Sequence, residues 1–372
     1  MKNGIVYKGD GIFDYCGWPT VARIDKNILA VAYSGNRLRH VCSFGKTMVC
    51  YSYDDGKTWS KPMAVVDTKF DDRDGGIVAN GKQVLVSSFN NTYKMQIRYL
   101  VRQVARYGRN DRTDNEENLI KTYIEMNKSA DEKDVCSSLS ISEDQGKTFS
   151  TRIIMPITSP HGPKVLSDGT YVWVGRNFSI DERDRTEGLR DYNFLEEGIY
   201  VMYSKDGYAW SEPERLPNIE NVVLSCEPDV IQINNGELLV HVRVVHKKDF
   251  SGDVESIYQI VSSHNRTQWS NPAPLGIDAI PSHLMRHSSG VIIMSAGRRV
   301  SPIAQQVFLS YDEGKTWSKP YSIDTDAPDE DMGYPSTVEL NDGSLMTVYY
   351  QHDKIGEKNY IKYTVWTLDE LK

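Results

Sequence analysis

Short apolar stretches recur along the chain, and a polar turn follows each of them. They read TMVCYS, SSLSIS, IYVMYS, YQIVSS and QQVFLS, at residues 47–52, 137–142, 199–204, 258–263 and 305–310. Runs of this length that are rich in β-branched and aromatic residues and end in turn residues are typical of strands. The pattern therefore predicts an all-β chain of short strands joined by tight turns.

The polar turn after these stretches is itself a repeat. Three copies are well kept and two are worn, at 52–59, 142–149, 310–317, 204–210 and 263–269. The first copy reads SYDDGKTW, in which Asp can cap the turn and Gly can adopt the positive φ that a hairpin requires. We expect Trp59 and Trp317, which end two copies, to be largely buried against their sheets.

The octapeptide resembles the Asp-box, also called the BNR repeat, which lies between the third and fourth strands of propeller blades. The serines that open the five copies are 90, 62, 59 and 47 residues apart, and such intervals are typical of four-stranded blades. Five copies and a last blade without one predict a six-bladed β-propeller, with residues 1–372 as a single domain. The final strand at 359–368 should pair with N-terminal strands and close the ring.

The longest interval contains a pattern of a different period. Apolar residues follow helical spacing at positions 97, 100, 101, 104 and 105, and again at 119, 120, 123 and 124. We therefore predict a helical insertion at about 93–133 within one blade. Three roles stay open for it: a lid over the site, a contact in a homo-oligomer, or a surface decoration.

Composition and charge narrow the class of protein. The chain has 372 residues, of which 39% are hydrophobic and 25% charged, as in globular domains with a sizeable core. Its net charge of −8 argues against a nucleic-acid partner, because phosphate binding needs a basic surface. Five cysteines without CxxC spacing favour free thiols, and we find neither a membrane span nor a signal peptide. We expect a cytoplasmic protein that has no membrane partner.

Segments between the repeats resemble the active-site segments of the sialidase superfamily, and they occur in the family's order. GYPS places Tyr334 where the family has a tyrosine nucleophile, and CEPD places Glu227 where it has the paired glutamate. HVRV supplies Arg243, and SAGRR supplies Arg298 or Arg299, as arginines for a sugar carboxylate. The resemblance implies a glycoside hydrolase acting on an acidic sugar. A neutral tyrosine nucleophile avoids repulsion by such a substrate, provided that a glutamate accepts its proton.

The chain departs from this family at two places. Gly17 stands where the family's first arginine should be, and TVYYQ lacks the glutamate that supports that arginine. The loop at 36–45, where the family has its acid/base aspartate, contains neither Asp nor Glu. His40 is the only group in that loop that can transfer protons near neutral pH. Asp72 and Asp74, in the DDRD stretch, are the alternative proton donors.

Three more residues are candidates for substrate binding: Arg37, Arg73 and His161. The missing arginine and aspartate leave a second mechanism open, in which His and Tyr cleave a uronic-acid linkage by β-elimination. A third hypothesis is a sugar-binding propeller without catalysis. No cofactor and no catalytic metal are implied, because the motifs for nucleotide, dinucleotide, zinc-hydrolase and serine-hydrolase sites are absent.

Overall fold

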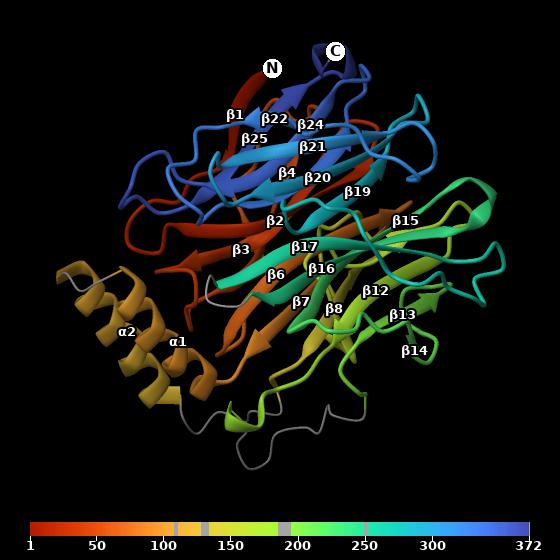
Figure 1. Ribbon diagram of the computed structural model, residues 1–372. Coiled ribbons are helices and arrows are strands. Elements are labelled where there is room, and N and C mark those ends of the chain that lie inside the picture. Colours follow the sequence, from red (N-terminus) through yellow and green to blue (C-terminus); the bar gives the residue numbers. More distant parts are fainter. Residues whose placement is uncertain (108–110, 128–133, 185–194, 249–251, 372) are drawn as a thin grey trace.

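The computed structural model describes residues 1–107, 111–127, 134–184, 195–248 and 252–371 (Figure 1). In these ranges the strands form six antiparallel sheets whose inner strands contact one another in a closed ring. The predicted six-bladed β-propeller is confirmed.

The first five blades are each built from consecutive strands, and in every blade the first strand lies next to the ring axis. The first two blades are β2 Tyr15–Asp25, β3 Ile28–Arg37, β4 Lys46–Ser52, β5 Met63–Val66, and β6 Asp71–Asn80, β7 Gln83–Asn91, β8 Ser137–Ser142, β9 Ile153–Met155. The next two are β10 Ile157–Thr158, β11 Lys164–Val165, β12 Tyr171–Asn177, β13 Ile199–Ser204, β14 Glu214–Arg215, and β15 Leu224–Gln232, β16 Leu238–Lys248, β17 Gly252–Val261, β18 Ala273–Pro274. The fifth blade is β19 Ser282–Arg286, β20 Ile292–Arg298, β21 Ala304–Ser310, β22 Tyr321–Asp324.

The sixth blade joins the two ends of the chain. It consists of β23 Gly333–Glu339, β24 Leu345–Gln351, β25 Tyr360–Trp366 and, as its outermost strand, β1 Lys2–Tyr7. β1 pairs antiparallel with β25, and the two termini lie near each other in Figure 1. Closure by the N-terminal strand, as predicted, pairs the last blade with the start of the chain and stabilises the ring.

The five repeats lie between the third and fourth strands of their blades, as predicted for an Asp-box. In the first copy, Ser52 Oγ accepts a hydrogen bond from the Gly56 amide at 2.7 Å, and Asp54 accepts one from the Thr58 amide at 2.8 Å. The copy at 310–317 repeats this geometry, with 2.8 Å and 2.9 Å. The repeat is therefore a self-capped turn of the scaffold.

Trp59 and Trp317 are mostly but not fully buried, which agrees with the expectation that they pack against their sheets. Each packs against an apolar cluster with part of its ring, because the box lies at the outer edge of the blade. We expect Trp317→Ala to lower the free energy of unfolding by about 2 kcal/mol, less than for a fully buried tryptophan, and to leave the catalytic rate unchanged. Denaturant titration and turnover measurements check this; full stability with lost activity would contradict a scaffold role.

The insertion in the second blade is helical, as predicted. α1 Tyr93–Tyr107 and α2 Asp111–Asn127 follow β7, and residues 108–110 and 128–133 of the expected range lie outside the described residues. Leu100 and Ile120 are buried in a cluster with Phe70, whereas Ile97 and Leu119 are exposed, contrary to the helical pattern. Short 3-10 turns complete the structure: η2 Glu182–Asp184, η3 Asn234–Gly236 and η4 Leu368–Leu371.

Other expectations from composition concern thiols and membranes. All five cysteines lie in described ranges, and each is buried and outside any disulfide. Across the described parts of the chain, no helix is long and apolar enough to cross a membrane.

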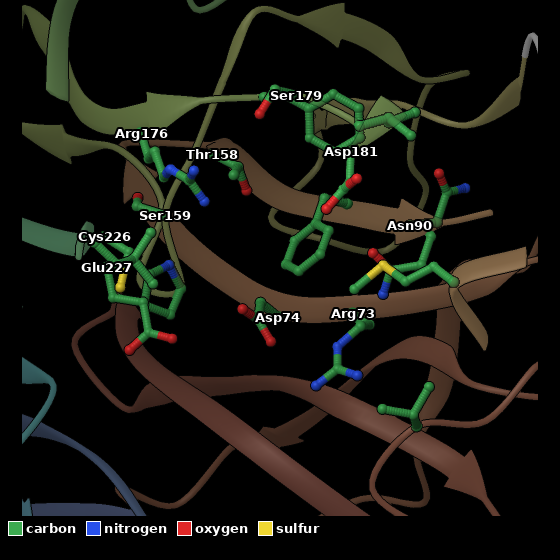
Figure 2. A pocket seen from close by; sticks show the side chains of 18 of the residues that line it. Arg73, Asp74, Asn90, Thr158, Ser159, Arg176, Ser179, Asp181, Cys226 and Glu227 are labelled. Carbon is green, nitrogen blue, oxygen red and sulfur yellow. The ribbon is translucent and has the colours of Figure 1, made fainter. Parts of the chain in front are cut away.

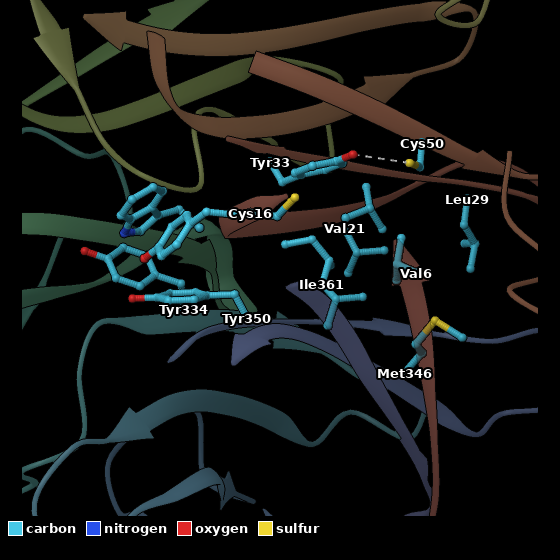
Figure 3. Close-up of a cluster of buried hydrophobic side chains, with 14 residues drawn as sticks. Val6, Cys16, Val21, Leu29, Tyr33, Cys50, Tyr334, Met346, Tyr350 and Ile361 are labelled. Carbon is cyan, nitrogen blue, oxygen red and sulfur yellow. Dashed lines mark hydrogen bonds between the residues drawn. The ribbon is translucent and has the colours of Figure 1, made fainter. Parts of the chain in front are cut away.

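Strand direction separates the boxes from a second rim. In the first blade, Leu29 pairs with Ser52 at the box end, and Tyr15 pairs with Arg37 at the other end. The starts of the inner strands and the loops after the second strands therefore gather opposite the boxes. The apolar core between the sixth and first blades reaches this rim, because Tyr334 and Tyr350 belong to the same cluster as Val21 (Figure 3).

Candidate active site

A cavity of about 1000 Å³ opens on the rim opposite the boxes. Every blade contributes to its lining through at least one side chain: Trp18, Arg73, Thr158, Glu227, Arg299 and Tyr334, in blade order. α1 adds part of the wall. The cavity thus brings together segments that are far apart in the sequence.

Four of the inner strands begin with the same backbone irregularity. Trp18, Asp74, Glu227 and Tyr334 have φ values of 54°, 51°, 48° and 51°, and the strand pairing is interrupted at each of them. Residues other than glycine seldom adopt this backbone, and it gathers at functional sites. All four side chains line the cavity, so the irregularity serves to direct them there.

Tyr334 and Glu227 are in direct contact. The Tyr334 hydroxyl donates a hydrogen bond of 2.5 Å to Glu227 Oε1, and Arg243 Nη1 lies 2.6 Å from Oε2. Burial raises the pKa of Glu227, but Arg243 and the Tyr334 hydroxyl outweigh it and leave that pKa below its ordinary value. Burial and the Glu227 charge raise the pKa of Tyr334 well above 10. A neutral phenol therefore donates to an ionised carboxylate.

Arg243 lies between two carboxylates. One of its terminal nitrogens contacts Glu227, and the other forms an ion pair with Glu255, on β17. Burial lowers the pKa of Arg243, but Glu227 is the first of several groups that raise it well above its ordinary value. Arg243 thus orients Glu227 and has both terminal nitrogens engaged.

Of the two candidate arginines in SAGRR, only Arg299 lines the cavity. Its guanidinium carbon lies 5.3 Å from the centre of the Tyr334 ring, and its Nε donates to the Met332 carbonyl at 3.0 Å. Arg298 turns outward and pairs with Asp278 at 3.2 Å. Alternation along β20 and the residue after it accounts for these opposite directions.

Asp74 projects into the cavity, and Figure 2 shows its carboxylate between Glu227 and Arg73. Its Oδ1 atom is buried without a hydrogen-bond partner among the described residues. Burial raises the pKa of Asp74 from 3.8 to about 7, against the opposing charge of Arg73. The site therefore contains a carboxyl group that can carry a proton near neutral pH.

Asp72 lies outside the cavity lining, although it is only two residues away. It accepts hydrogen bonds from the Thr68 amide at 2.7 Å and from Asn90 at 3.2 Å, and so caps the turn before β6. Burial raises the pKa of Asp72 to about 7 as well. Of the two candidate aspartates, only Asp74 faces the space where a substrate would bind.

Arg73 lies in the cavity lining, and Arg37 lies outside it. Arg73 lines the cavity, and its guanidinium carbon lies 4.3 Å from the centre of the Trp18 ring. Arg37 is fully buried, pairs with Asp71 at 2.5 Å and donates to the Asp72 carbonyl at 3.1 Å. Arg37 therefore ties the first blade to the second, outside the cavity lining.

His40 lines the cavity beside Trp18. Its Nδ1 atom lies 3.0 Å from the Tyr15 hydroxyl and 3.2 Å from Asp331. Burial lowers the pKa of His40 and outweighs the opposing effect of Asp331. A neutral imidazole is thus held by a tyrosine and an aspartate.

His161 lies outside the cavity lining, in the SPHGP segment that separates β10 from β11. It is 1% exposed, and its Nδ1 atom lies 3.0 Å from Thr20 Oγ1. Burial holds the pKa of His161 well below 6.5. The structure places this residue in the packed interior between blades.

Two tyrosines occupy the space beside Gly17, where the resemblance implied a missing arginine. A β-carbon at Gly17 would lie 3.6 Å from the Tyr15 ring and 3.7 Å from the Tyr350 ring. Tyr350 is buried, and its hydroxyl accepts a hydrogen bond of 3.4 Å from Arg299. Aromatic side chains therefore fill the space beside Gly17.

Comparison with known proteins bears on this fold. Residues 188–362 match the profile of a family described as BNR repeat-like domain. The match covers a little under half of the chain, from the third blade to the sixth, and agrees with the six-bladed propeller. No curated protein matches the sequence of this propeller significantly.

Solved structures share the whole propeller. A Dyadobacter fermentans protein of unknown function has a TM-score of 0.72 at 15% identity, over 98% of this chain and 97% of that one. An intramolecular trans-sialidase from Ruminococcus gnavus has 0.64 at 17%, over 100% and 98%. An intramolecular trans-sialidase from leech has 0.66 at 14%, over 100% and 71%. At these identities the likeness concerns the fold.

Proposed function

We propose that this propeller is a glycoside hydrolase that cleaves glycosides of an acidic sugar. The observation that carries the proposal is the 2.5 Å contact between Tyr334 and an ionised Glu227, in a cavity that also contains Asp74. Sialidase-like neighbours agree with a carbohydrate ligand.

The first half of the reaction forms a covalent intermediate. Tyr334 Oη attacks the anomeric carbon, and Glu227 takes the phenol proton as the new C–O bond forms. The bond to the leaving oxygen breaks, and protonated Asp74 gives its proton to that oxygen. The leaving group departs as an alcohol, and the sugar remains on Tyr334.

The second half releases the sugar. Asp74, now a carboxylate, removes a proton from water, whose oxygen attacks the anomeric carbon. The bond to Tyr334 breaks, and Glu227 returns its proton to the phenolate. Two displacements at the same carbon give retention of configuration.

Arg299 and Arg73 are the proposed contacts for the acidic group of the sugar. Both line the cavity and lie over the neighbouring Tyr334 and Trp18 rings. Arg73 has one carboxylate contact, with Asp71 at 3.4 Å, whereas both terminal nitrogens of Arg243 contact carboxylates. Guanidinium groups bind carboxylates through paired N–H donors. Arg299 and Arg73 would partly replace the arginine that the resemblance implied at position 17.

A panel of 4-methylumbelliferyl glycosides tests the proposal. We expect release of fluorophore from the glycoside of sialic acid or of a uronic acid, and much slower release from the matched neutral sugars. Polysaccharides of uronic acids serve as a second arm: an unsaturated product detected by mass spectrometry would show elimination instead. Binding of an acidic sugar without any product would make the chain a sugar-binding protein.

The pH dependence of turnover is a further prediction. Asp74 must be protonated to act as the acid, and burial raises its pKa to about 7, so kcat/KM for poor leaving groups should fall as pH rises above about 7. Glu227 must be ionised, and its pKa lies below its ordinary value, so activity should persist into mildly acidic solution. A profile that rises through pH 7 would contradict this assignment.

A further inference from the structure

The cavity extends well beyond the groups that carry the chemistry. Met95, Arg98 and Tyr99, on α1, line it together with Asp181 and Asp184 of the third blade. Residues three and four apart share one face of a helix, so these three α1 residues present a single surface. Figure 2 shows Asp181 and Ser179 on the other side of the cavity from Asp74. We call the surface formed by Met95, Arg98, Tyr99, Asp181 and Asp184 the distal wall.

α1 is held firmly enough to act as part of a binding site. Thr92 caps its start by accepting a hydrogen bond from the Met95 amide at 3.2 Å. On the neighbouring helix face, the Tyr93 ring lies 4.7 Å from that of Phe70, and Leu100 is 1% exposed. Packing against the propeller thus fixes the direction of the cavity-facing residues.

The charges on and beside the distal wall are paired. Arg98 forms an ion pair with Asp184, whose side chain is only 4% exposed, and this pair joins α1 to η2. Next to the wall, Arg176 pairs with Glu197 at 2.9 Å. A surface of mutually neutralised ions with a tyrosine offers hydrogen bonds and ring contact but no excess charge.

We propose that the distal wall is a subsite for the leaving group and that this group is a neutral oligosaccharide. The inference rests on the proposed function, because it requires an acidic sugar bound at Tyr334. A cavity of about 1000 Å³ is at the upper end of the range for small-molecule sites, which leaves room for more than one sugar ring. The paired ions can form hydrogen bonds with hydroxyl groups, but they supply no excess charge to attract a charged leaving group.

Two probes with the same acidic sugar separate the subsite from the chemistry. One is its 4-methylumbelliferyl glycoside, and the other is its glycoside on lactose, with the sugar chosen as the one released fastest in the panel above. We expect Tyr99→Ala and Arg98→Ala to raise KM for the lactoside about tenfold, the equivalent of about 1.4 kcal/mol of binding. KM for the aryl glycoside should rise less than KM for the lactoside, because the aryl leaving group is smaller than a disaccharide and has no sugar hydroxyl groups to bond to the distal wall. Ile97→Ala, on the exposed face of the same helix, is the matched control.

Loss of Arg98 removes the partner of the buried Asp184, so a variant that leaves this ion pair in place is also needed. Met95→Trp adds bulk to the distal wall, so it should raise KM for the lactoside more than KM for the aryl glycoside, whose leaving group is smaller. Unchanged KM for the lactoside in Tyr99→Ala and Met95→Trp, with normal hydrolysis of the aryl glycoside, would overturn the subsite and leave the proposed function standing. If wild-type protein cleaves neither probe, the proposed function fails first. Calorimetry of the lactoside with the wild type and Tyr99→Ala then decides the subsite: equal affinities, or no binding by either protein, overturn it.

Discussion

Replacing Asp74 with asparagine is expected to lower kcat for an oligosaccharide glycoside by about 10²–10⁴-fold. The amide cannot give a proton to the leaving oxygen, although it fills the same space in the cavity. An aryl glycoside needs little protonation because its phenolate leaves readily, so its first step should be affected far less. The measurement is the ratio of kcat/KM for the two kinds of leaving group in the wild type and the variant.

Two matched variants show whether this effect belongs to Asp74. Asp72→Asn makes the same change two residues away, outside the cavity lining, and should keep near-normal turnover. His40→Gln removes the imidazole that lies beside Trp18 and should also keep most of the turnover, because a neutral imidazole with a lowered pKa is a poor acid. Loss of turnover in His40→Gln, together with normal turnover in Asp74→Asn, would favour a histidine-driven elimination.

The same raised pKa values affect stability. Asp72 and Asp74 bind protons more tightly in the folded chain than their ordinary value of 3.8 allows, with pKa values of about 7. Their contribution to stability is therefore greatest below about pH 4 and declines as pH rises through 7. The cost of keeping two buried carboxyl groups is consistent with a local role for each, as a turn cap and as the proposed acid.

The fold could be predicted from the sequence because its signal is local and repeated. Each Asp-box is a self-contained turn in which Ser52 and Asp54, or their equivalents, satisfy the backbone of the same octapeptide. Each turn can therefore be recognised from its own residues, without knowledge of the rest of the blade. The helices of the insertion were predicted for a similar reason, but the exposed faces of Ile97 and Leu119 depend on packing that the period does not contain.

The choice within pairs of neighbouring residues could not be made from the sequence. Asp72 and Asp74 were alternatives, as were Arg298 and Arg299, because direction depends on strand alternation and on where a bulge interrupts it. Only the second member of each pair lines the cavity.

Trp18 was missed, although a signal for it was present. GWPT, CEPD and GYPS share a residue followed by proline at the start of an inner strand, and Trp18, Glu227 and Tyr334 occupy the same backbone conformation there. Aligning these three segments with one another would have identified Trp18 as a cavity residue. It could not have shown that Tyr350 fills the space beside Gly17, because that contact joins two different blades.

Removing the Tyr334 hydroxyl should have the largest effect of any substitution in the cavity. In Tyr334→Phe the nucleophile is gone, and we expect kcat to fall by about 10³-fold or more, while the acidic sugar still binds to Arg299. Glu227→Gln should be similarly impaired, because the amide cannot take the proton of the phenol. The same change removes the carboxylate charge that Arg243 contacts at 2.6 Å. Thermal unfolding of both variants checks that the fold is kept.

The double variant is the sharper measurement, because the two residues act as one unit if the mechanism is right. Tyr334→Phe with Glu227→Gln should then cost about as much as either change alone, since neither group works without the other. Mass spectrometry of the wild type stopped during turnover should find the sugar attached to the peptide that contains Tyr334, and the double variant should lack it. Losses that simply multiply, or a wild type that never carries sugar on Tyr334, would mean that the 2.5 Å contact is structural and that water, rather than tyrosine, attacks the sugar.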